Sequence, residues 1–564
     1  MFEIIDRDAS ARLGEWTVGK HKIKTPTIAI VVNPNRQVIP PEVMKKMGVE
    51  LIITNSYIIN KKPETRKMFS KRGLHASLNW DGPIYTDSGT FQMFSQSLKD
   101  LPNKKIIQFQ KKIKSDIITP VDVFTLPKDD LKIAKKKLTE TIKRIKEAKS
   151  LVRNFNAPIQ GGRHLALRKQ ACQKLAKVDP LIYSIGGIVP YMEQYRFTKL
   201  GEIILTCKGN LPPNYPVHAF GAGHPMVFAF LTALGCDVFD SAMYSLAAQR
   251  GAYLTVRGTL EAASLREFPC TCPACSCTTV KEFKSMSLYQ KEKFLTLHNL
   301  YVTVGEIRTV RQAIRNDRLW ELVQQRARAH PKLLEALHAI LKNHGHELAK
   351  NEKLSKSAAF FYSGVESSFR PEVFQAKERA KFCSGKKTKH LFWDKVPVGL
   401  RDTYPFLQSI VPGGVKYPQI KPAIQLRTII DYQFGKGASK KFTSLQLEVS
   451  KKTHRIRRVR KQGKFLGSIR PQDGLFIPSF DGAKLLGKYI RKVDVRDREV
   501  AGFIKIGKSL FARFAYPENK ITPGQEVLVT LRKKPLALGT ALLSTEEMKS
   551  FSRGMAVKIR KTIS

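Results

Sequence analysis

Short apolar segments alternate with helical patterns through the first 260 residues, and this alternation constrains the fold more than any other feature. Helical patterns such as 131–152 and 224–234 separate several of the segments. Eight segments read as strands: 28–32, 51–55, 84–87, 118–122, 158–161, 182–187, 217–221 and 237–240. Eight strand–helix units predict a (β/α)8 TIM barrel, within an α/β chain. A doubly wound open sheet is the alternative.

Many of these strand candidates end in a polar residue or a glycine: Asn55, Asp87, Asp122, Gln160, Gly187 and Asp240. In a barrel, the carboxyl ends of all strands open onto one face, and that face carries the chemistry. Closure of the barrel is expected to bring Asp87 and Asp240 together, although they lie far apart in the sequence.

The chain has 564 residues, which is too many for one hydrophobic core. Residues 305–350 have a helical pattern, and 490–564 read as a small β-rich module. The strands expected in that module are 499–506, 509–516, 526–533 and 537–544. The predicted domains are a catalytic barrel with a metal-binding insertion at about 265–300, two small α+β domains, and the β-rich module: 1–345, 346–412, 413–485 and 486–564.

The charge is strongly positive, with 98 Lys and Arg against 47 Asp and Glu, a formal net charge of +51. Such an excess favours a polyanionic partner, above all nucleic acid. A generally basic proteome is the other explanation. The chain has no apolar run long enough for a membrane span and no signal-like N-terminus, so a cytoplasmic protein without membrane contact is expected.

Four of the eight cysteines fall within eight residues, in the segment FPCTCPACSC. The spacing Cys270-x-Cys272-x2-Cys275, followed by His298, matches a Cys₃His set for one structural Zn²⁺. All four ligands are protein groups, so no position stays open for catalysis. Without the cysteines, His298 would read as a core histidine. Cys277 is a spare thiol that could replace a neighbouring ligand.

Six ordered motifs, together with the Cys₃His set, resemble those of tRNA-guanine transglycosylases. They are TDSGTFQMF (86–94), SDIITPVD (115–122), PIQGG (158–162), YSIGGIVP (183–190), FGAGHPMVF (220–228) and CDVFDSAMY (236–244). The C-terminal third is similar to the extension of the archaeal members, which ends in a PUA domain. The resemblance implies a TIM barrel with a zinc-bearing insertion, a homodimer, and exchange of guanine at position 15 in the D-arm of tRNA for 7-cyano-7-deazaguanine (preQ0).

Base exchange at a sugar C1′ needs one carboxylate to attack and one group to move the proton of the base. By resemblance, Asp240 is the nucleophile and Asp87 the general acid/base. The residues alone allow the opposite assignment, and an aspartate before Ser-Gly is also a common turn residue.

The resemblance also assigns the residues that hold the base. Asp122 would accept the N1–H and 2-amino groups, which guanine-like bases donate. Gln160 and the backbone of Gly187 would read the O6 or 7-substituent side, while Ser88 helps to hold the base and Phe91 and Phe220 sandwich it. Ordinary core packing is the alternative for the two phenylalanines.

The basic run HRIRRVRK (454–461) and the PUA-like module are expected to bind the tRNA backbone, although basic runs are also often solvated faces. The sequence departs from the family pattern at Thr90, where bacterial relatives carry glycine, and at Lys114, where glycine is expected. The rival functions are an archaeosine synthase-like paralogue, which lacks the transglycosylase aspartates, a non-catalytic PUA-type RNA-binding protein, and the anticodon-directed enzyme, which lacks the long extension.

Overall fold

The computed structural model describes residues 1–563 except 91–101, 391–393, 407–408 and 412–417. These residues form two compact units. The first comprises 1–6, 11–315 and 322–340, and the second comprises 7–10, 316–321 and 341–564.

Eight parallel strands form the centre of the first unit, in the order β7-β6-β5-β4-β11-β10-β9-β8. A parallel bridge between Ile118 and Phe155 joins the two ends of this order, with the Ile118 amide donating to the Asn154 carbonyl at 2.9 Å. The sheet is therefore closed, which confirms the barrel and excludes the open sheet. The strands are β4 (Thr27–Val31), β5 (Leu51–Asn55), β6 (Ile84–Asp87), β7 (Ile117–Ile118), β8 (Asn156–Ile159), β9 (Ile182–Ile185), β10 (Val217–Ala219) and β11 (Val238–Ser241).

The fourth strand is shorter than the predicted 118–122, because β7 ends at Ile118. Pro120 has no amide hydrogen, and side chains of neighbouring helices take the other amides of this segment. Gln110 accepts from the Thr119 amide, Asn103 from the Val121 amide and Thr141 from the Val123 amide, each at 2.9 Å. The chain therefore leaves the sheet without leaving these amides unpaired.

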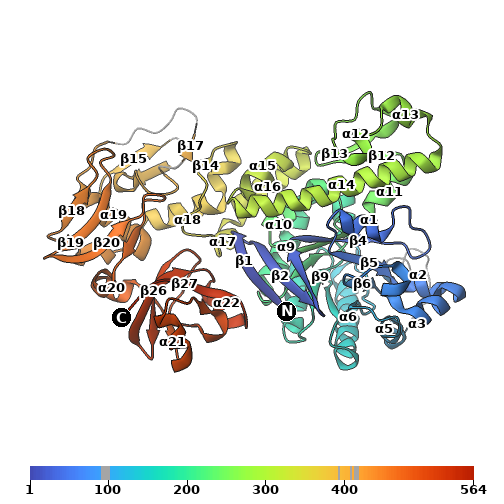
Figure 1. Ribbon diagram of the computed structural model, residues 1–564, viewed down its shortest axis with the longest axis horizontal. Coiled ribbons are helices and arrows are strands. Elements are labelled where there is room, and N and C mark those ends of the chain that lie inside the picture. Colours follow the sequence, from blue (N-terminus) through green and yellow to red (C-terminus); the bar gives the residue numbers. More distant parts are fainter. Residues whose placement is uncertain (91–101, 391–393, 407–408, 412–417, 564) are drawn as a thin grey trace. The chain divides into compact units, whose positions relative to one another are not determined.

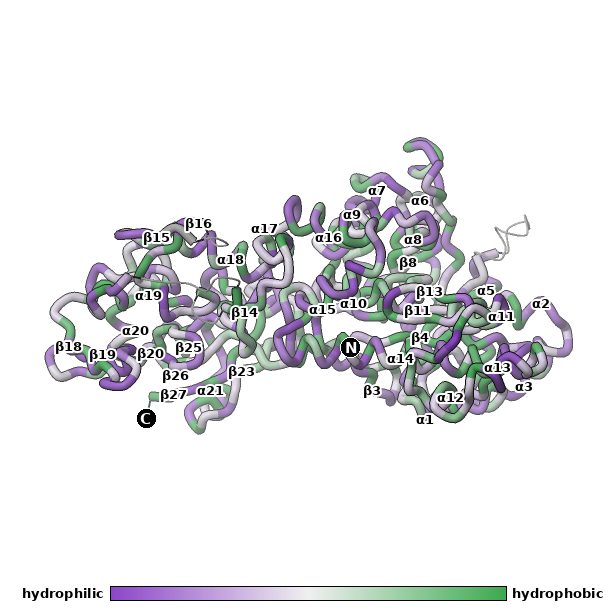
Figure 2. Tube along the Cα trace, turned by 90° about the horizontal axis from the view of Figure 1, so that it is seen from above, coloured by the Kyte–Doolittle hydropathy of each residue, from purple (hydrophilic) through white to green (hydrophobic). Residues whose placement is uncertain are grey.

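Helices surround the barrel strands, as Figure 1 shows for α3 (Pro63–Leu78), α6 (Leu131–Leu151) and α9 (Phe197–Asn210). The predicted helix 131–152 is α6, which begins where the Asp130 carboxylate accepts from the Ile133 amide at 2.7 Å. Its buried residues recur every three or four positions, so hydrophobic and hydrophilic segments alternate along its trace in Figure 2. The predicted helix 224–234 is α10 (Pro225–Ala233), which is buried on all sides.

Other helices of this unit are α5 (Asn103–Lys112), α7 (Leu165–Leu175), α11 (Met243–Gln249) and α14 (Leu288–Arg315). An antiparallel sheet that the sequence pattern did not predict precedes the barrel, with β1 (Phe2–Asp8), β2 (Ala11–Val18) and β3 (His21–Thr25). The helical pattern of 305–350 is confirmed by the end of α14 and by α15 (Leu319–Ala327), α16 (Pro331–Asn343) and α17 (Gly345–Ala349).

The second unit contains a four-stranded sheet, β18 (Gln446–Val449), β19 (Ile456–Lys461), β20 (Lys464–Ile469) and β21 (Phe476–Pro478). A six-stranded sheet near the C-terminus has the order β23-β27-β26-β25-β22-β24. Its strands are β22 (Arg491–Val495), β23 (Leu510–Phe511), β24 (Tyr516–Pro517), β25 (Glu526–Leu531), β26 (Lys534–Ala541) and β27 (Met555–Thr562). β25 and β26 confirm the strands expected at 526–533 and 537–544, while the expected strand 509–516 is divided between β23 and β24.

The strand expected at 499–506 is wrong, because this segment forms the helix α21 (Arg498–Lys505). The Asp497 carboxylate accepts from the amides of Glu499 and Val500 at 2.8 and 3.3 Å and so begins the helix. Ala501 and Ile504, three residues apart, are its buried residues, which is helical rather than strand spacing. Among the described residues, no helix of the protein is long and apolar enough to cross a membrane.

Candidate functional site

A pocket of about 560 Å³ opens where the carboxyl ends of the barrel strands meet. Six of the eight residues predicted for catalysis and base binding line it: Asp87, Asp122, Gln160, Gly187, Phe220 and Asp240. Ser88 is fully buried, and its hydroxyl lies 3.0 Å from that of Thr90, which does line the pocket. Phe91 lies outside the described residues.

Asp240 lies in β11, and its two carboxylate oxygens differ in their surroundings. Oδ1 accepts from His218 Nε2 at 2.8 Å and from the Gly221 amide at 2.5 Å. Because a carboxylate only accepts, His218 carries its proton on Nε2. Oδ2 accepts no hydrogen bond from any residue that the structure describes. The carboxylate is thus held through one oxygen and leaves the other available.

Asp87 ends β6 and accepts a hydrogen bond on Oδ2 from Asn55 Nδ2 at 2.9 Å. The Asn55 amide is itself oriented, because its Oδ1 accepts from the Ile58 amide at 3.0 Å at the start of α2 (Ser56–Lys61). Burial, and then the nearby charges of Asp122 and Asp240, raise the pKa of Asp87 to about 7. Asp87 can therefore both give and take a proton near neutral pH.

The Asp122 carboxylate lies beside the Gln160 carboxamide, which donates from Nε2 to Asp122 Oδ2 at 2.6 Å. Burial raises the pKa of Asp122, and the hydrogen bond from Gln160 opposes this shift. The Gly186–Gly187 segment passes directly over Gln160. A Cβ on Gly186 would lie 2.6 Å from Gln160 Nε2, and Gly187 has a φ of +67°, so both positions need glycine.

Phe220 follows β10 and is half-buried in the pocket. Its ring is nearly parallel to that of the buried Tyr85, with 6.4 Å between the centroids and 10° between the planes. The centroid of the His218 ring lies 4.9 Å from the centroid of the Phe220 ring. The sequence motifs did not predict a role for His218 or Asn55 in the site. Asn55 does end a strand candidate, and that position was the available signal.

Thr90 and Lys114, the two departures from the family pattern, both have a structural consequence. The Thr90 hydroxyl donates to the backbone carbonyl of Asp122 at 3.3 Å and so links two segments of the pocket. Lys114 has a φ of +60°, in the left-handed region that favours glycine. The glycine expected at position 114 is therefore a backbone requirement, which this chain meets at the cost of strain.

The predicted metal ligands come together beside the hairpin of β12 (Ala252–Thr255) and β13 (Gly258–Glu261). The ligand atoms of Cys270, Cys272, Cys275 and His298 all lie within 4.8 Å of one another. His298 donates from Nε2 to the Leu254 carbonyl at 2.9 Å, so Nδ1, 3.4 Å from Cys275 Sγ, keeps its lone pair for a metal.

Three thiols and one imidazole in this arrangement can hold a metal ion. Cys277 is exposed and does not belong to the cluster. The cluster lies in a small core of its own, which includes Tyr253, Phe283 and Phe294.

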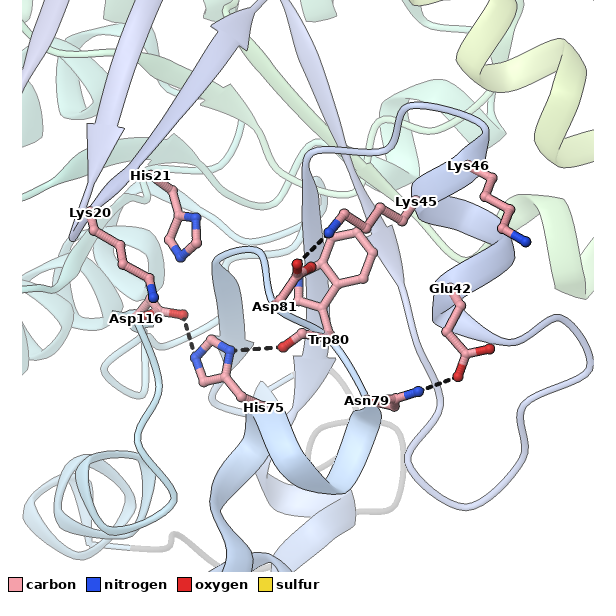
Figure 3. A pocket seen from close by; sticks show the side chains of 10 residues that line it. All are labelled: Lys20, His21, Glu42, Lys45, Lys46, His75, Asn79, Trp80, Asp81 and Asp116. Carbon is pink, nitrogen blue, oxygen red and sulfur yellow. Dashed lines mark hydrogen bonds and ion pairs between the residues drawn. The ribbon is translucent and has the colours of Figure 1, made fainter.

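A second pocket, of about 900 Å³, is lined by residues of segments that lead into barrel strands (Figure 3). His75 Nδ1 donates to the Trp80 carbonyl at 3.0 Å, and Nε2 lies 3.0 Å from Asp116 Oδ2. Both partners are hydrogen-bond acceptors, which favours the protonated imidazole, and the bond to Asp116 raises the pKa of His75. This network fastens the segments that enter β6 and β7.

Comparison with known proteins identifies the family. The profile of the family described as "Queuine tRNA-ribosyltransferase" matches residues 6–332, that of the "patch-forming domain C2 of tRNA-guanine transglycosylase" matches 424–492, and that of the PUA domain matches 482–563. The chain belongs to the tRNA-guanine transglycosylase family. The resemblance seen in the sequence motifs is therefore confirmed.

Full-length relatives carry the name tRNA-guanine(15) transglycosylase. The protein of Pyrococcus furiosus is 41% identical and that of Thermococcus kodakarensis 38%, with 100% of this chain and 98% and 99% of theirs covered. The protein of Methanocaldococcus jannaschii is 36% identical, with 99% of both chains covered.

Proposed function

We propose that the protein exchanges guanine at position 15 in the D-arm of tRNA for preQ0, a step of archaeosine biosynthesis, by double displacement through a covalent ribosyl-aspartate. The observation that carries this proposal is the grouping of Asp87, Asp122 and Asp240 in one pocket at the strand ends, with a different environment for each. The full-length relatives named tRNA-guanine(15) transglycosylase support position 15 as the target.

Asp240 acts as the nucleophile. His218 and Gly221 hold Oδ1, so Oδ2 attacks C1′ of the ribose. The C1′–Oδ2 bond forms as the C1′–N9 bond breaks, and the electron pair of the broken bond leaves with guanine. Asp87, with a pKa of about 7, gives a proton to the departing base and takes one from the incoming base. The second displacement then releases Asp240.

Asp122 accepts the N1–H and 2-amino groups of the base. The second N–H of the Gln160 amide and the Gly187 backbone face its O6 and 7-substituent side. Phe220 stacks on the base, with Phe91 proposed for its other side and Ser88 as support. The target nucleotide must leave the stacked RNA to reach the pocket.

Binding of tRNA is assigned to the C-terminal half. In β19, Arg457, Arg458 and Arg460 are exposed on a ribbon that suits the phosphate backbone. The proposed domains remain 1–345, 346–412, 413–485 and 486–564, with the last binding RNA as a PUA domain.

We also propose that the Cys₃His cluster holds one structural Zn²⁺, bound by Cys270, Cys272, Cys275 and His298. The metal would fix the fold of the insertion, and no catalytic step passes through it. The homodimer implied by the family resemblance and the cytoplasmic location stay predictions.

The test is release of labelled guanine from position 15 of tRNA when unlabelled preQ0 is added, for the wild-type protein and for Asp240→Ala and Asp87→Ala. Release by the wild type, none by Asp240→Ala, and a covalent protein–RNA adduct that depends on Asp240 are expected. Tight tRNA binding without release by the wild type would refute the proposal and favour the paralogue that modifies the inserted base, or a non-catalytic RNA-binding protein.

A further inference from the structure

Arg168 is a fully buried arginine in α7. Its Nε donates to the Gly162 carbonyl at 3.1 Å, and its Nη1 donates to the carbonyls of Ile159 and Gly186 at 2.6 and 2.8 Å. Its Nη2 makes no hydrogen bond within the described part of the chain. The guanidinium forms no ion pair with any residue that the structure describes.

A buried cation without a carboxylate is an unfavourable arrangement. Other buried or half-buried arginines of the same unit have carboxylate partners. Arg12 is paired with Asp237, and Arg326 forms two hydrogen bonds with Glu306, at 2.8 and 2.9 Å. Arg168 departs from this pattern, and such departures are expected where a residue serves function rather than stability.

The three carbonyls bound by Arg168 belong to the two segments that carry Gln160 and Gly187. Ile159 and Gly162 lie on either side of the Gln160–Gly161 step, and Gly186 directly precedes Gly187. A Cβ on Gly187 would lie 3.1 Å from Gln160 Oε1 and 3.6 Å from Arg168 Nη2. The guanidinium therefore lies next to the side of the pocket that faces O6 and the 7-substituent in the proposed function.

We propose that Arg168 is a positioning residue with an electrostatic role. Its planar fork sets the spacing between the segments after β8 and β9, and thereby the positions of Gln160 and Gly187. Its uncompensated charge favours the negative charge that spreads from N9 towards O6 as the C1′–N9 bond breaks. This inference rests on the proposed base exchange.

The test compares Arg168→Lys, which keeps the charge and loses the fork, with Arg168→Met, which loses both. Arg326→Lys is the matched control, an arginine of the same unit outside the pocket. Exchange is measured as kcat and as separate KM values for preQ0 and tRNA. The nitrile stretching frequency of bound preQ0 reports the local field without depending on turnover.

Arg168→Lys is expected to raise the KM for preQ0 about tenfold or more, because a small displacement of Gln160 and Gly187 weakens binding of the base by this order of magnitude. The KM for tRNA is expected to stay unchanged. Arg168→Met is expected, in addition, to lower kcat to roughly a hundredth of the wild-type value and to shift the nitrile frequency. Arg326→Lys is expected to change neither KM nor the frequency.

The inference is overturned if the Arg168 variants lose activity only in proportion to their folded fraction, or if both KM values rise together. If Arg168→Met does not fold, Arg168→Lys decides alone through its effect on the KM for preQ0. Absence of exchange by the wild-type protein refutes the proposed function instead, so the two failures are distinguishable.

Discussion

Asp87→Asn is expected to stabilise the protein at alkaline pH while abolishing base exchange. Burial and the neighbouring carboxylates raise the pKa of Asp87 from 3.8 to about 7 in the folded protein. Between these values the folded state keeps a proton that the unfolded chain has lost, so the stability of the folded state falls as the pH rises through this window. Asparagine does not ionise and has nearly the size of aspartate, so the stability of the variant should not decrease in this way as the pH rises.

The magnitude follows from the two pKa values. At about 1.36 kcal/mol per pKa unit, Asp87 destabilises the folded state by about 4 kcal/mol at pH 8 and by roughly 1.6 kcal/mol at pH 5. The difference in unfolding free energy between Asp87→Asn and the wild type should therefore grow by about 2.5 kcal/mol from pH 5 to pH 8.

The assay is urea unfolding at both pH values. Unfolding is monitored through hydrogen exchange in peptides from β5 and β6, so that the barrel unit is observed by itself. Glu64→Gln, an exposed carboxylate-to-amide change on α3, is the control and should show no such growth. A stability difference for Asp87→Asn that is the same at pH 5 and pH 8 would refute the electrostatic reasoning, and with it the basis for Asp87 as the acid/base.

Three further predictions concern the rest of the first unit. Lys114→Gly should raise the unfolding free energy by roughly 0.5–1 kcal/mol, since relief of left-handed strain exceeds the entropy lost by glycine; a decrease in urea unfolding would contradict this. The pKa of His75 is raised in the folded protein, so His75 contributes to the stability of the folded state. This contribution is fully present below the pKa that His75 has in the unfolded chain, and it is lost as the pH rises through the pKa in the folded protein. His75→Asn should therefore destabilise the protein more at pH 5.5 than at pH 9, by less than about 1 kcal/mol, because the pair is partly exposed; equal losses in thermal unfolding would count against it. Cys275→Ser should remove the metal measured by elemental analysis and unfold the insertion before the barrel, whereas Cys277→Ser should keep one equivalent; equal metal contents in the two variants would exclude the assigned ligand set.

The sequence pattern was sufficient for the eight strand–helix units, whereas closure of the barrel over an open sheet was decided by the structure. Each of the eight strands is a short apolar segment, so local composition indicated its presence. Apart from the pair β4–β11, which joins the first and the last strand of the barrel, neighbouring strands also follow one another in the chain. The polar ends of these strands indicated Asp87, Asp122, Gln160 and Asp240, because closure of a parallel barrel brings strand ends together whatever the separation in sequence. The Cys₃His set was readable for a similar reason, since three of its ligands lie within six residues.

Elsewhere the tertiary structure decided what local patterns could not. The fourth strand stops at Ile118 because side chains of the neighbouring helices α5 and α6 accept from the amides that follow it. Residues 498–505 form a helix, because Asp497 caps its start and the residues that folding buries have helical spacing, although the composition of this segment is also compatible with a strand. His218 and Arg168 enter the site only through contacts between elements. Such contacts leave no periodic signal, because hydrogen bonds and buried charge depend on atoms brought together by folding rather than on their order in the chain.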